Sequence, residues 1–300
     1  MAIDPPNSTS TRSGDPCEAM KASTTTPTSP PPPGADTPLS DADLKAVQKF
    51  IFEAAGITLD NSKRMLISGR LSKRLRFHGL ARFADYLKLI VRDDHERQVA
   101  LDLLTTNETY FFREPQHFDF LRHEVIPNRR RGDAFRVWSA ACSSGEEPYS
   151  IAMLLDDELG TAPWEVVGTD ISTRVLESCR RGRYPLERAQ HIPQAYLKTY
   201  CLKGVGPEDG FLLVEKHLRQ KIHFLHGNLN GRLPNVGQFD VVFLRNVMIY
   251  FDGDTKRKLI QRLLSHIVPG GWLFIGHSET LNGINDQVRQ MKPAIYQMPR

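Results

Sequence analysis

The chain has 300 residues, 40% of them hydrophobic and 25% charged, which fits one or two globular domains with a real core and excludes fibrous and membrane-embedded proteins. Apolar runs stay well short of the roughly 18 residues of a spanning helix, and the N-terminus lacks a charged start followed by an apolar segment, so a cytoplasmic location is expected. The net charge of +4 is a mild basic excess, without the strong bias of a dedicated nucleic-acid binder.

Residues 1–39 are crowded with Ser, Thr and Pro, including the run from Pro30 to Pro33, and almost lack large apolar side chains. Such a segment buries too little apolar surface to offset the entropy of ordering, so we predict that it is disordered. The rest of the chain holds 37 basic and 31 acidic side chains, a net charge of +6.

Residues 40–105 predict a small all-helical domain. Ser40 is a candidate N-cap ahead of apolar residues at helical spacing, and that first helix is expected to stop near Gly56. Further helices fit residues 61–78, 83–93 and about 95–104.

The helix predicted at 61–78 carries six basic side chains and no acidic one. Lys63, Arg70, Lys73 and Arg74 fall on one side of it. A solvated helix face explains this pattern, and so does a binding surface for an anionic partner; the absence of any acid favours the partner.

Residues 106–300 alternate between strand and helix patterns, beginning with Pro115 at a first helical turn. Strands are predicted at 135–139, 165–169, 221–226, 239–244, 272–276 and 294–298, and helices at 147–159, 173–181 and 254–266. This alternation is typical of an α/β fold with a mostly parallel sheet, in which ligands bind beyond the carboxyl ends of the strands.

An insertion at about 187–222 interrupts the alternation. It contains two short helical segments, a turn at 206–210 and a strand-like run at 211–214 that could pair with 221–225. The insertion is either a docking element or a covered loop, and the sequence leaves both open.

The run from Val137 to Ser150 reads as a buried strand, a tight loop and a helix start. A phosphate site places glycines at a helix N-terminus and excludes anions, whereas Gly145 here is followed by Glu146 and Glu147. The loop therefore suits a ligand with ribose hydroxyls and a cationic end, such as S-adenosylmethionine. Cys142 could be a nucleophile in this loop, although a small residue packed beside a ligand is the simpler interpretation.

Polar residues follow three other strands. Asp170 could bind both hydroxyls of a ribose or serve as an N-cap for the following helix. Asn228 and Leu229 could hold an adenine edge and ring, and Asn246 is placed for a ligand's amino-acid portion. Tyr250 could point its hydroxyl into the same cleft or belong to the core.

Three further groups complete the candidates. Arg113 follows aromatic residues at the domain junction, where it could simply stack and cap or could face a cleft. The triplet from His277 to Glu279 mimics a hydrolase triad, but adjacent residues at a strand end cannot form one. His223 and His226 lack a third ligand, and the four widely spaced cysteines form no paired motif, so neither a metal site nor a disulfide framework is expected.

These residues together resemble the bacterial chemotaxis receptor glutamate methyltransferases of the CheR type. The resemblance runs from about Ser40 to the C-terminus and is carried by the runs 107–114, 138–150, 246–251 and 276–279. It implies a Rossmann-like S-adenosylmethionine-dependent methyltransferase fold with an N-terminal all-helical domain and a small antiparallel β insertion.

The resemblance also implies an activity, partners and site residues. Such enzymes use S-adenosylmethionine to methylate glutamates on the cytoplasmic helices of methyl-accepting chemoreceptors, with S-adenosylhomocysteine as the product and no metal. The basic helix would contact the receptor, and the insertion captures a receptor's C-terminal tail in some members. Arg113 and Tyr250 would face the substrate carboxylate, and the cofactor would be lined by Asn107, Thr109, Arg113, Glu147, Asp170, Asn228, Leu229, Asn246 and Val247.

Other functions are weighed against this one. A nucleic-acid methyltransferase would be expected to carry an Asn-Pro-Pro-Tyr run after the fourth strand or a Pro-Cys nucleophile in the sheet domain, and the chain has neither. A non-enzymatic signalling adaptor would have no need of the set of cofactor-facing residues. A dehydrogenase would need a dinucleotide glycine fingerprint, which is missing.

Overall fold

The computed structural model describes residues 38–130 and 132–300. The predicted disordered extension therefore lies outside the described residues, apart from Pro38 and Leu39. Leu39 is buried against the first helices of the chain. In the described part, no helix is long and apolar enough to cross a membrane.

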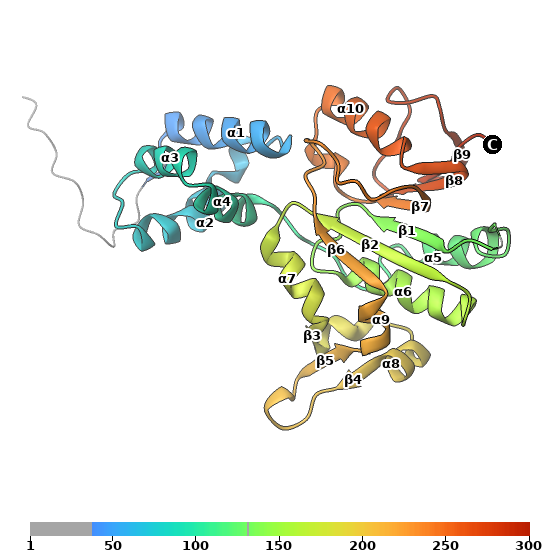
Figure 1. Ribbon diagram of the computed structural model, residues 1–300. Coiled ribbons are helices and arrows are strands. Elements are labelled where there is room, and N and C mark those ends of the chain that lie inside the picture. The colour runs from blue at the N-terminus through green and yellow to red at the C-terminus, as the bar shows by residue number, and fades with distance from the viewer. Residues whose placement is uncertain (1–37, 131) are drawn as a thin grey trace, which may run out of the picture.

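Four helices form the N-terminal domain (Figure 1). They are α1 (Asp41–Ala55), α2 (Arg64–Phe77, preceded by the 3₁₀ turn Asn61–Lys63), α3 (Phe83–Arg92) and α4 (Asp94–Leu104). Ser40 caps α1 as predicted, because its hydroxyl accepts the amide of Asp43, and Gly56 ends the helix in the left-handed conformation at φ 73°. The apolar faces of all four helices enclose one core of their own.

A seven-stranded sheet forms the larger domain, in the order β6-β2-β1-β7-β8-β10-β9. The first five of these strands run parallel, and β10 and β9 are added antiparallel. The strands are β1 (Phe135–Ser139), β2 (Trp164–Asp170), β6 (Ile222–His226), β7 (Phe239–Leu244), β8 (Ile267–Ile275), β9 (Arg289–Lys292) and β10 (Ile295–Gln297).

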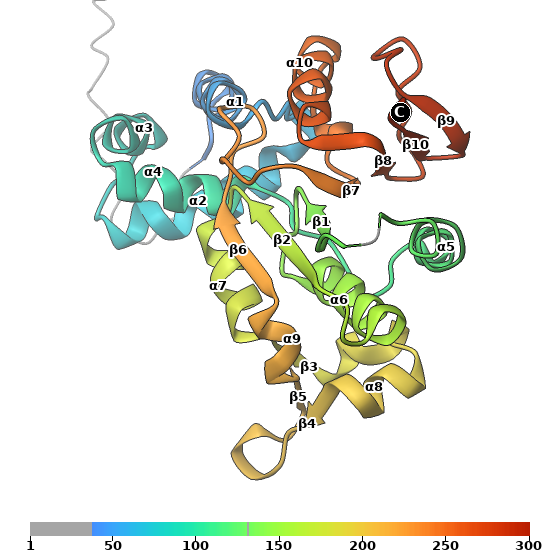
Figure 2. The same cartoon turned by 45° about the vertical axis from the view of Figure 1, so that its right-hand side comes forward.

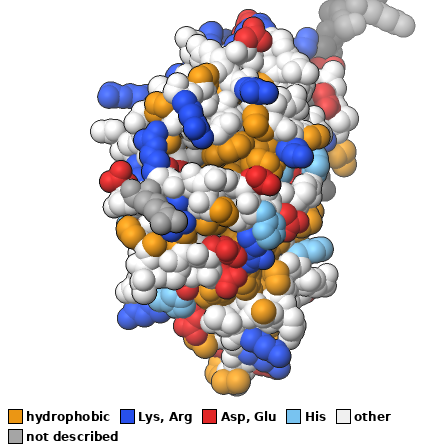
Figure 3. Space-filling view, turned by 90° about the vertical axis from the view of Figure 1, so that its right-hand side faces the viewer, with side chains coloured by type: hydrophobic (Ala, Val, Ile, Leu, Met, Phe, Trp, Pro, Cys, Tyr) orange, Lys and Arg blue, Asp and Glu red, His pale blue; other side chains and the backbone are white. Residues whose placement is uncertain are grey.

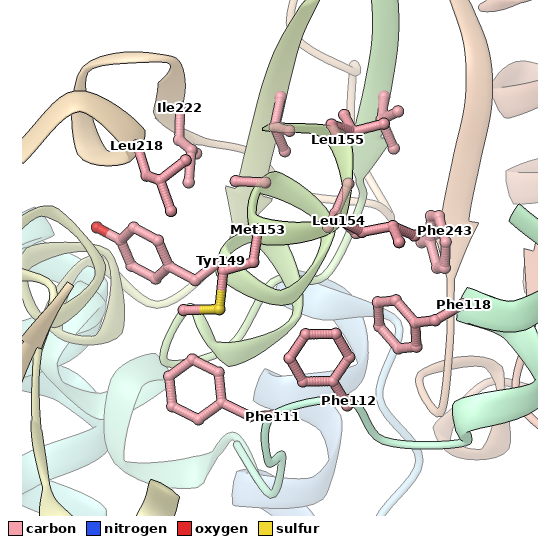
Figure 4. Packing of buried hydrophobic residues seen from close by; sticks show 14 of the residues in the cluster. Phe111, Phe112, Phe118, Tyr149, Met153, Leu154, Leu155, Leu218, Ile222 and Phe243 are labelled. Atoms are coloured by element: carbon pink, nitrogen blue, oxygen red, sulfur yellow. The ribbon is translucent and has the colours of Figure 1, made fainter. Parts of the chain in front are cut away.

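Helices cover both faces of this sheet, so its parallel strands are buried (Figures 1 and 2). The apolar residues of α5 (Pro115–Phe120), α6 (Glu146–Leu159) and α7 (Thr173–Arg181) pack on one face, and those of α10 (Gly253–Leu264) on the other. Figure 4 shows Phe111 and Phe112 in the first of these cores, close to Tyr149 and Met153 of α6. These two phenylalanines anchor the segment that joins the helical domain to the sheet.

Two departures from the predicted strands have local causes. Strand β8 begins at Ile267 instead of residue 272, because Pro269, Gly270 and Gly271, which resemble a turn, are accommodated in the strand with a shift in register. Strand β9 was missed because all four of its side chains are exposed and give no apolar alternation.

The insertion is a separate three-stranded antiparallel sheet in the order β3-β5-β4. It contains β3 (Arg183–Pro185), β4 (Cys201–Lys203), β5 (Phe211–Val214), the 3₁₀ helices Leu186–His191 and Gly206–Glu208, and α8 (Gln194–Tyr200). The predicted pairing of 211–214 with 221–225 is wrong: β5 pairs with β3 and β4, whereas β6 joins the large sheet beside β2. The short helix α9 (Lys216–Gln220) separates the two strands and redirects the chain.

Candidate functional site

The carboxyl ends of β1, β2, β6 and β7 open into a cavity between the sheet and the helical domain. Its volume, counted with its open mouth, is about 950 Å³. Every cofactor and catalytic residue predicted from the sequence lines it: Asn107, Thr109, Arg113, Glu147, Asp170, Asn228, Leu229, Asn246, Val247 and Tyr250. Residues more than 130 positions apart in sequence thus meet at one edge of the sheet.

The loop between β1 and α6 depends on Gly145. Its φ of 99° is left-handed, and a Cβ there would lie 2.7 Å from the Tyr184 hydroxyl and 3.0 Å from the Cys179 sulfur. The Tyr149 amide donates to the Gly145 carbonyl at 3.1 Å, so α6 starts at this turn and its first carboxylates, Glu146 and Glu147, are fixed immediately afterwards.

Glu147 lies in the cavity wall with both carboxylate oxygens engaged. Oε1 accepts the Ser139 hydroxyl at 2.6 Å, and Oε2 lies 3.1 Å from the Arg245 guanidinium. Burial raises the pKa of Glu147, and the charge of Arg245 opposes that rise. The ion pair joins the start of α6 to the residue after β7, and the Ser139 hydroxyl links the same carboxylate to the end of β1.

Arg245 is a residue that the sequence analysis missed. Its side chain is 2% exposed, lies 3.3 Å from Glu114 as well as 3.1 Å from Glu147, and donates to the Arg113 carbonyl. Burial raises the pKa of Glu114, but Arg245, the His277 amide, His117 and Asn246 together outweigh burial and hold that pKa below its usual value. An arginine directly after an apolar strand was the available signal, because a buried guanidinium needs acidic partners.

Asp170 accepts two backbone amides, from Ser143 and Ser172, each at 2.9 Å. Burial raises the pKa of Asp170, and these two hydrogen bonds oppose the rise. It is not the N-cap of α7. Ser172 is the cap residue, and Asp102 of α4 accepts the Thr173 and Arg174 amides at 3.1 Å, so the helical domain is tied to this helix.

The helical domain also forms one wall of the cavity, through Ala55, Ile57, Leu59 and Leu104. The sequence analysis did not foresee this wall. Asn228 is part of the junction, because its side-chain NH₂ donates to the Ala54 carbonyl at 2.7 Å and its oxygen accepts the Asn230 amide at 2.9 Å. These contacts hold the Asn228 side chain against α1.

Glu279 organises the loop after β7. It accepts the amides of Asn246, Gly276 and Ile249 at 3.0, 2.7 and 3.3 Å. Asn246 adopts a left-handed φ of 57°, which these bonds stabilise. Glu279, the last residue of the triplet at 277–279, therefore supports the cavity loop through backbone amides.

Arg113 and Tyr250 face the same cavity from different elements. One Nη of Arg113 donates to the Glu108 carbonyl at 2.9 Å, and the guanidinium lies 5.7 Å from the centre of the Tyr110 ring. Tyr250, in the 3₁₀ helix Met248–Tyr250, packs beside the core and lines the cavity, and its carbonyl accepts the Thr58 amide at 2.8 Å.

The basic face of α2 divides into two kinds of residue. Arg70 donates to the Leu103 and Thr105 carbonyls at the end of α4, and Arg74 forms a two-armed ion pair with Glu96. Lys63 and Lys73 are exposed. The side of the molecule that lies to the right in Figure 1 carries mixed charge: Figure 3 shows acidic and basic side chains interspersed on it.

The remaining candidates have structural contacts. Cys142 is 1% exposed, burial raises the pKa of its thiol well above the ordinary value, and it does not line the cavity, so nothing supports a nucleophile. His226 contacts the Ile171 carbonyl at 3.1 Å, and His223 lies 3.9 Å from Glu165. In residues 38–130 and 132–300, no group of three or more His, Cys, Asp or Glu side chains is arranged to hold a metal ion.

Comparison with known proteins identifies both domains. Residues 42–105 match the model of the CheR methyltransferase all-alpha domain, and residues 107–296 match that of the CheR methyltransferase SAM-binding domain. The chain is 41% identical to a chemotaxis protein methyltransferase of Escherichia coli over 87% of this chain and 92% of the relative. It is 42% identical to one of Salmonella typhimurium (82% and 86%) and 36% identical to one of Borreliella burgdorferi (85% and 93%).

The cavity fits S-adenosylmethionine on its own donor set. Asp170 at the end of β2 brings to the cavity a carboxylate of the kind that accepts ribose hydroxyls, and the acidic start of α6 at Glu147 suits a cation and would repel a phosphate. Apolar side chains such as Leu229 and Ile57 supply surface for an aromatic ring. The chain belongs to the CheR family of chemotaxis protein methyltransferases, and its larger domain is a SAM-binding methyltransferase domain.

Proposed function

We propose that this protein transfers a methyl group from S-adenosylmethionine to glutamate side chains on the cytoplasmic helices of chemoreceptors, as a protein-glutamate O-methyltransferase. The observation that carries the proposal is that Arg113 and Tyr250 share one cavity with the predicted cofactor residues. The relatives named above are chemotaxis protein methyltransferases, which supports a substrate within chemotaxis.

The cofactor supplies an electrophilic methyl group bound to a sulfonium. A glutamate carboxylate has an ordinary pKa of about 4.3 and is ionised at neutral pH, so the protein needs no general base. Its residues have instead to orient the carboxylate, exclude water and leave the attacking oxygen free of strong hydrogen bonds.

Arg113 is suited to the orienting role. Among the described residues its guanidinium donates one hydrogen bond, to the Glu108 carbonyl, so donors remain for one oxygen of a substrate carboxylate. Tyr250, which lines the same cavity, would hold this carboxylate or the amino-acid end of the cofactor with its hydroxyl. Asp170, with an oxygen still able to accept, would hold the ribose, and Asn107, Thr109, Asn228, Leu229, Asn246 and Val247 complete the cofactor surface.

The exposed Lys63, in the turn before α2, and Lys73 of α2 are proposed to meet the acidic surface of the receptor helices. Arg70 and Arg74 belong to the same face, but their contacts with α4 reduce what they can offer a partner. The insertion at 183–214 is a separate candidate for a receptor tail.

The test is incubation with labelled S-adenosylmethionine and receptor cytoplasmic fragments. We expect label to enter the receptor as a base-labile ester, which mass spectrometry maps to glutamate side chains. Binding of the receptor without transfer of label would favour an adaptor. Transfer to RNA or DNA, with steep salt-dependent binding, would favour a nucleic-acid methyltransferase.

A further inference from the structure

The insertion makes direct contacts with two of the segments that line the cavity. Three of its side chains reach across: Tyr184, Arg188 and His191. Tyr184 donates to the Ser144 carbonyl at 2.8 Å, and the His191 ring packs against that of Tyr110 in a tilted arrangement with ring centres 4.7 Å apart. The insertion is therefore packed against the loop after β1 and against the domain-linking segment at 107–113.

Arg188 is the charged member of this contact. Its guanidinium pairs with Glu146, whose side chain is 0% exposed at the start of α6. The other partner of that carboxylate is the Ser144 hydroxyl, at 2.6 Å. Burial raises the pKa of Glu146, and the Ser144 hydroxyl and the charge of Arg188 oppose that rise. Arg188 therefore favours the ionised form of a buried carboxylate, and removing it would leave that carboxylate without its cation.

The same nitrogen of Arg188 also donates to the Thr109 carbonyl at 3.2 Å. Thr109 lines the cavity and precedes Arg113 by four residues, whereas Glu146 directly precedes the cavity residue Glu147. The Arg188 guanidinium thus connects the segment at 107–113, which carries Arg113, with the start of α6, which carries Glu147.

Tyr184 limits how far the loop can move on its own. Its ring is 4% exposed, packs edge-on against Phe111 at 5.0 Å, and leaves no room for a Cβ at Gly145. The steric contact of Tyr184 and the ion pair of Arg188 act on adjacent residues of the same loop. Through these two contacts the insertion packs directly against the loop between β1 and α6, which forms part of the cavity lining.

We propose that Arg188 is a positioning residue of the methyl-transfer site, through which the insertion fixes the Thr109 carbonyl and the Glu146 end of the cofactor loop. Arg188 does not line the cavity, so it acts through these two groups and makes no contact with the cofactor. The inference rests on the cofactor site proposed above and is independent of the methyl acceptor. It gives the insertion a part in the reaction besides any docking of a partner.

The test compares Arg188→Gln with Arg183→Gln in the full chain. Arg183 is a matched control, because it lies in the same insertion, its side chain is equally exposed at 39%, and it forms an ion pair with Glu208 on the surface. Titration calorimetry with S-adenosylhomocysteine measures the cofactor site without any receptor, so failure to methylate a receptor glutamate leaves the result interpretable.

We expect Arg188→Gln to weaken the affinity for S-adenosylhomocysteine about tenfold and Arg183→Gln to leave it unchanged. In the double variant Glu146→Gln/Arg188→Gln part of the affinity should return, because no buried carboxylate is left unpaired. Wild-type affinity in Arg188→Gln would overturn the proposal. An equal loss of affinity in Arg188→Gln and Arg183→Gln would also overturn it, since it would indicate a general effect on the stability of the insertion. The same holds if the double variant binds no better than Arg188→Gln.

Discussion

The cavity and the basic face of α2 contrast in how their predicted residues are used. At the cavity, all ten predicted residues line one space, because parallel strands end at one edge of a sheet and their following loops must converge there. On α2, Arg70 and Arg74 turn inward to the end of α4 and to Glu96, whereas Lys73 and Lys63, which lies in the turn before the helix, are exposed. Topology fixes where a strand end points, whereas a long basic side chain can fold back onto its own domain.

The largest effect is expected at the cavity, from Arg113→Ala. Without its guanidinium the substrate carboxylate loses its orienting contact, and kcat should fall about 100- to 1,000-fold, equivalent to ~3–4 kcal/mol in the activation barrier. The measurement is initial-rate kinetics with labelled S-adenosylmethionine and a receptor fragment. Calorimetry with S-adenosylhomocysteine serves as the control and should retain much of the affinity, and unchanged turnover would remove Arg113 from the mechanism.

The next effect tests the inward-facing half of α2. Arg74→Ala leaves the Glu96 carboxylate, which is 1% exposed, with the Tyr86 hydroxyl at 2.6 Å and His78 at 2.9 Å as partners. The free energy of unfolding should fall by about 2–3 kcal/mol, near the lower end for a broken buried pair because those two partners remain. Urea denaturation measures it. A loss below about 0.5 kcal/mol would mean that Arg74 is in practice a surface residue.

The same ion pair predicts a dependence on acid. Burial raises the pKa of Glu96, but hydrogen bonds from Arg74, Tyr86 and His78 outweigh burial and lower it from 4.5 to about 2. Because the folded-state pKa lies below the unfolded value, this contribution to stability is complete above pH 4.5 and is lost as the pH falls toward 2. Between these pH values the free energy of unfolding, measured by denaturation, should fall less steeply with acid in Glu96→Gln than in the wild type. Equal pH dependence in the two proteins would contradict the assignment.

A smaller effect is expected from Asp170→Ala at the cavity. Asp170 would bind ribose equally in the ground state and the transition state, so its loss should raise KM and weaken S-adenosylhomocysteine binding about tenfold, or ~1.4 kcal/mol, with less change in kcat. Asp170→Asn, which keeps an oxygen for one of the two backbone amides, controls for loop disorder and should fall between. Full affinity in the alanine variant by calorimetry would reject the ribose role.

The parts of the site that the sequence could predict share a physical reason. Asp170, Asn246 and Glu147 are polar residues directly after apolar strands or at a helix start, and such positions are visible in the letters alone. Arg245, Glu114 and the wall at Ala55 and Ile57 depend on contacts between distant segments. The sequence gives only a partial indication of these residues, because local spacing does not show which residue will contact another one 130 positions away.

The same distinction explains the fold. The bounds of β1, β7 and α7 are predicted to the residue, because buried strands and capped helices have strong local patterns. Strand β9 and the pairing of β5 escaped prediction, since an exposed edge strand lacks alternation and the partner of a strand is chosen by the path of the whole chain. Arg70 and Arg74 belong to this second group, because their acceptors lie on another helix.

The smallest effect should come from Lys73→Ala, next to Arg74 in sequence but exposed on α2. The free energy of unfolding should change by less than about 0.5 kcal/mol, because no buried group loses a partner. If this face meets acidic receptor helices, Lys73→Ala should raise the KM for the receptor fragment about two- to threefold. The double variant Lys63→Ala/Lys73→Ala should raise it further. The kcat should not change, since a surface charge chiefly affects association. The rise should disappear at high salt, where the wild type loses the same attraction. A KM equal to wild type at low salt in the double variant would show that Lys63 and Lys73 only form a solvated face. The basic residues at 63–74 would then share their charge but no role in binding a receptor.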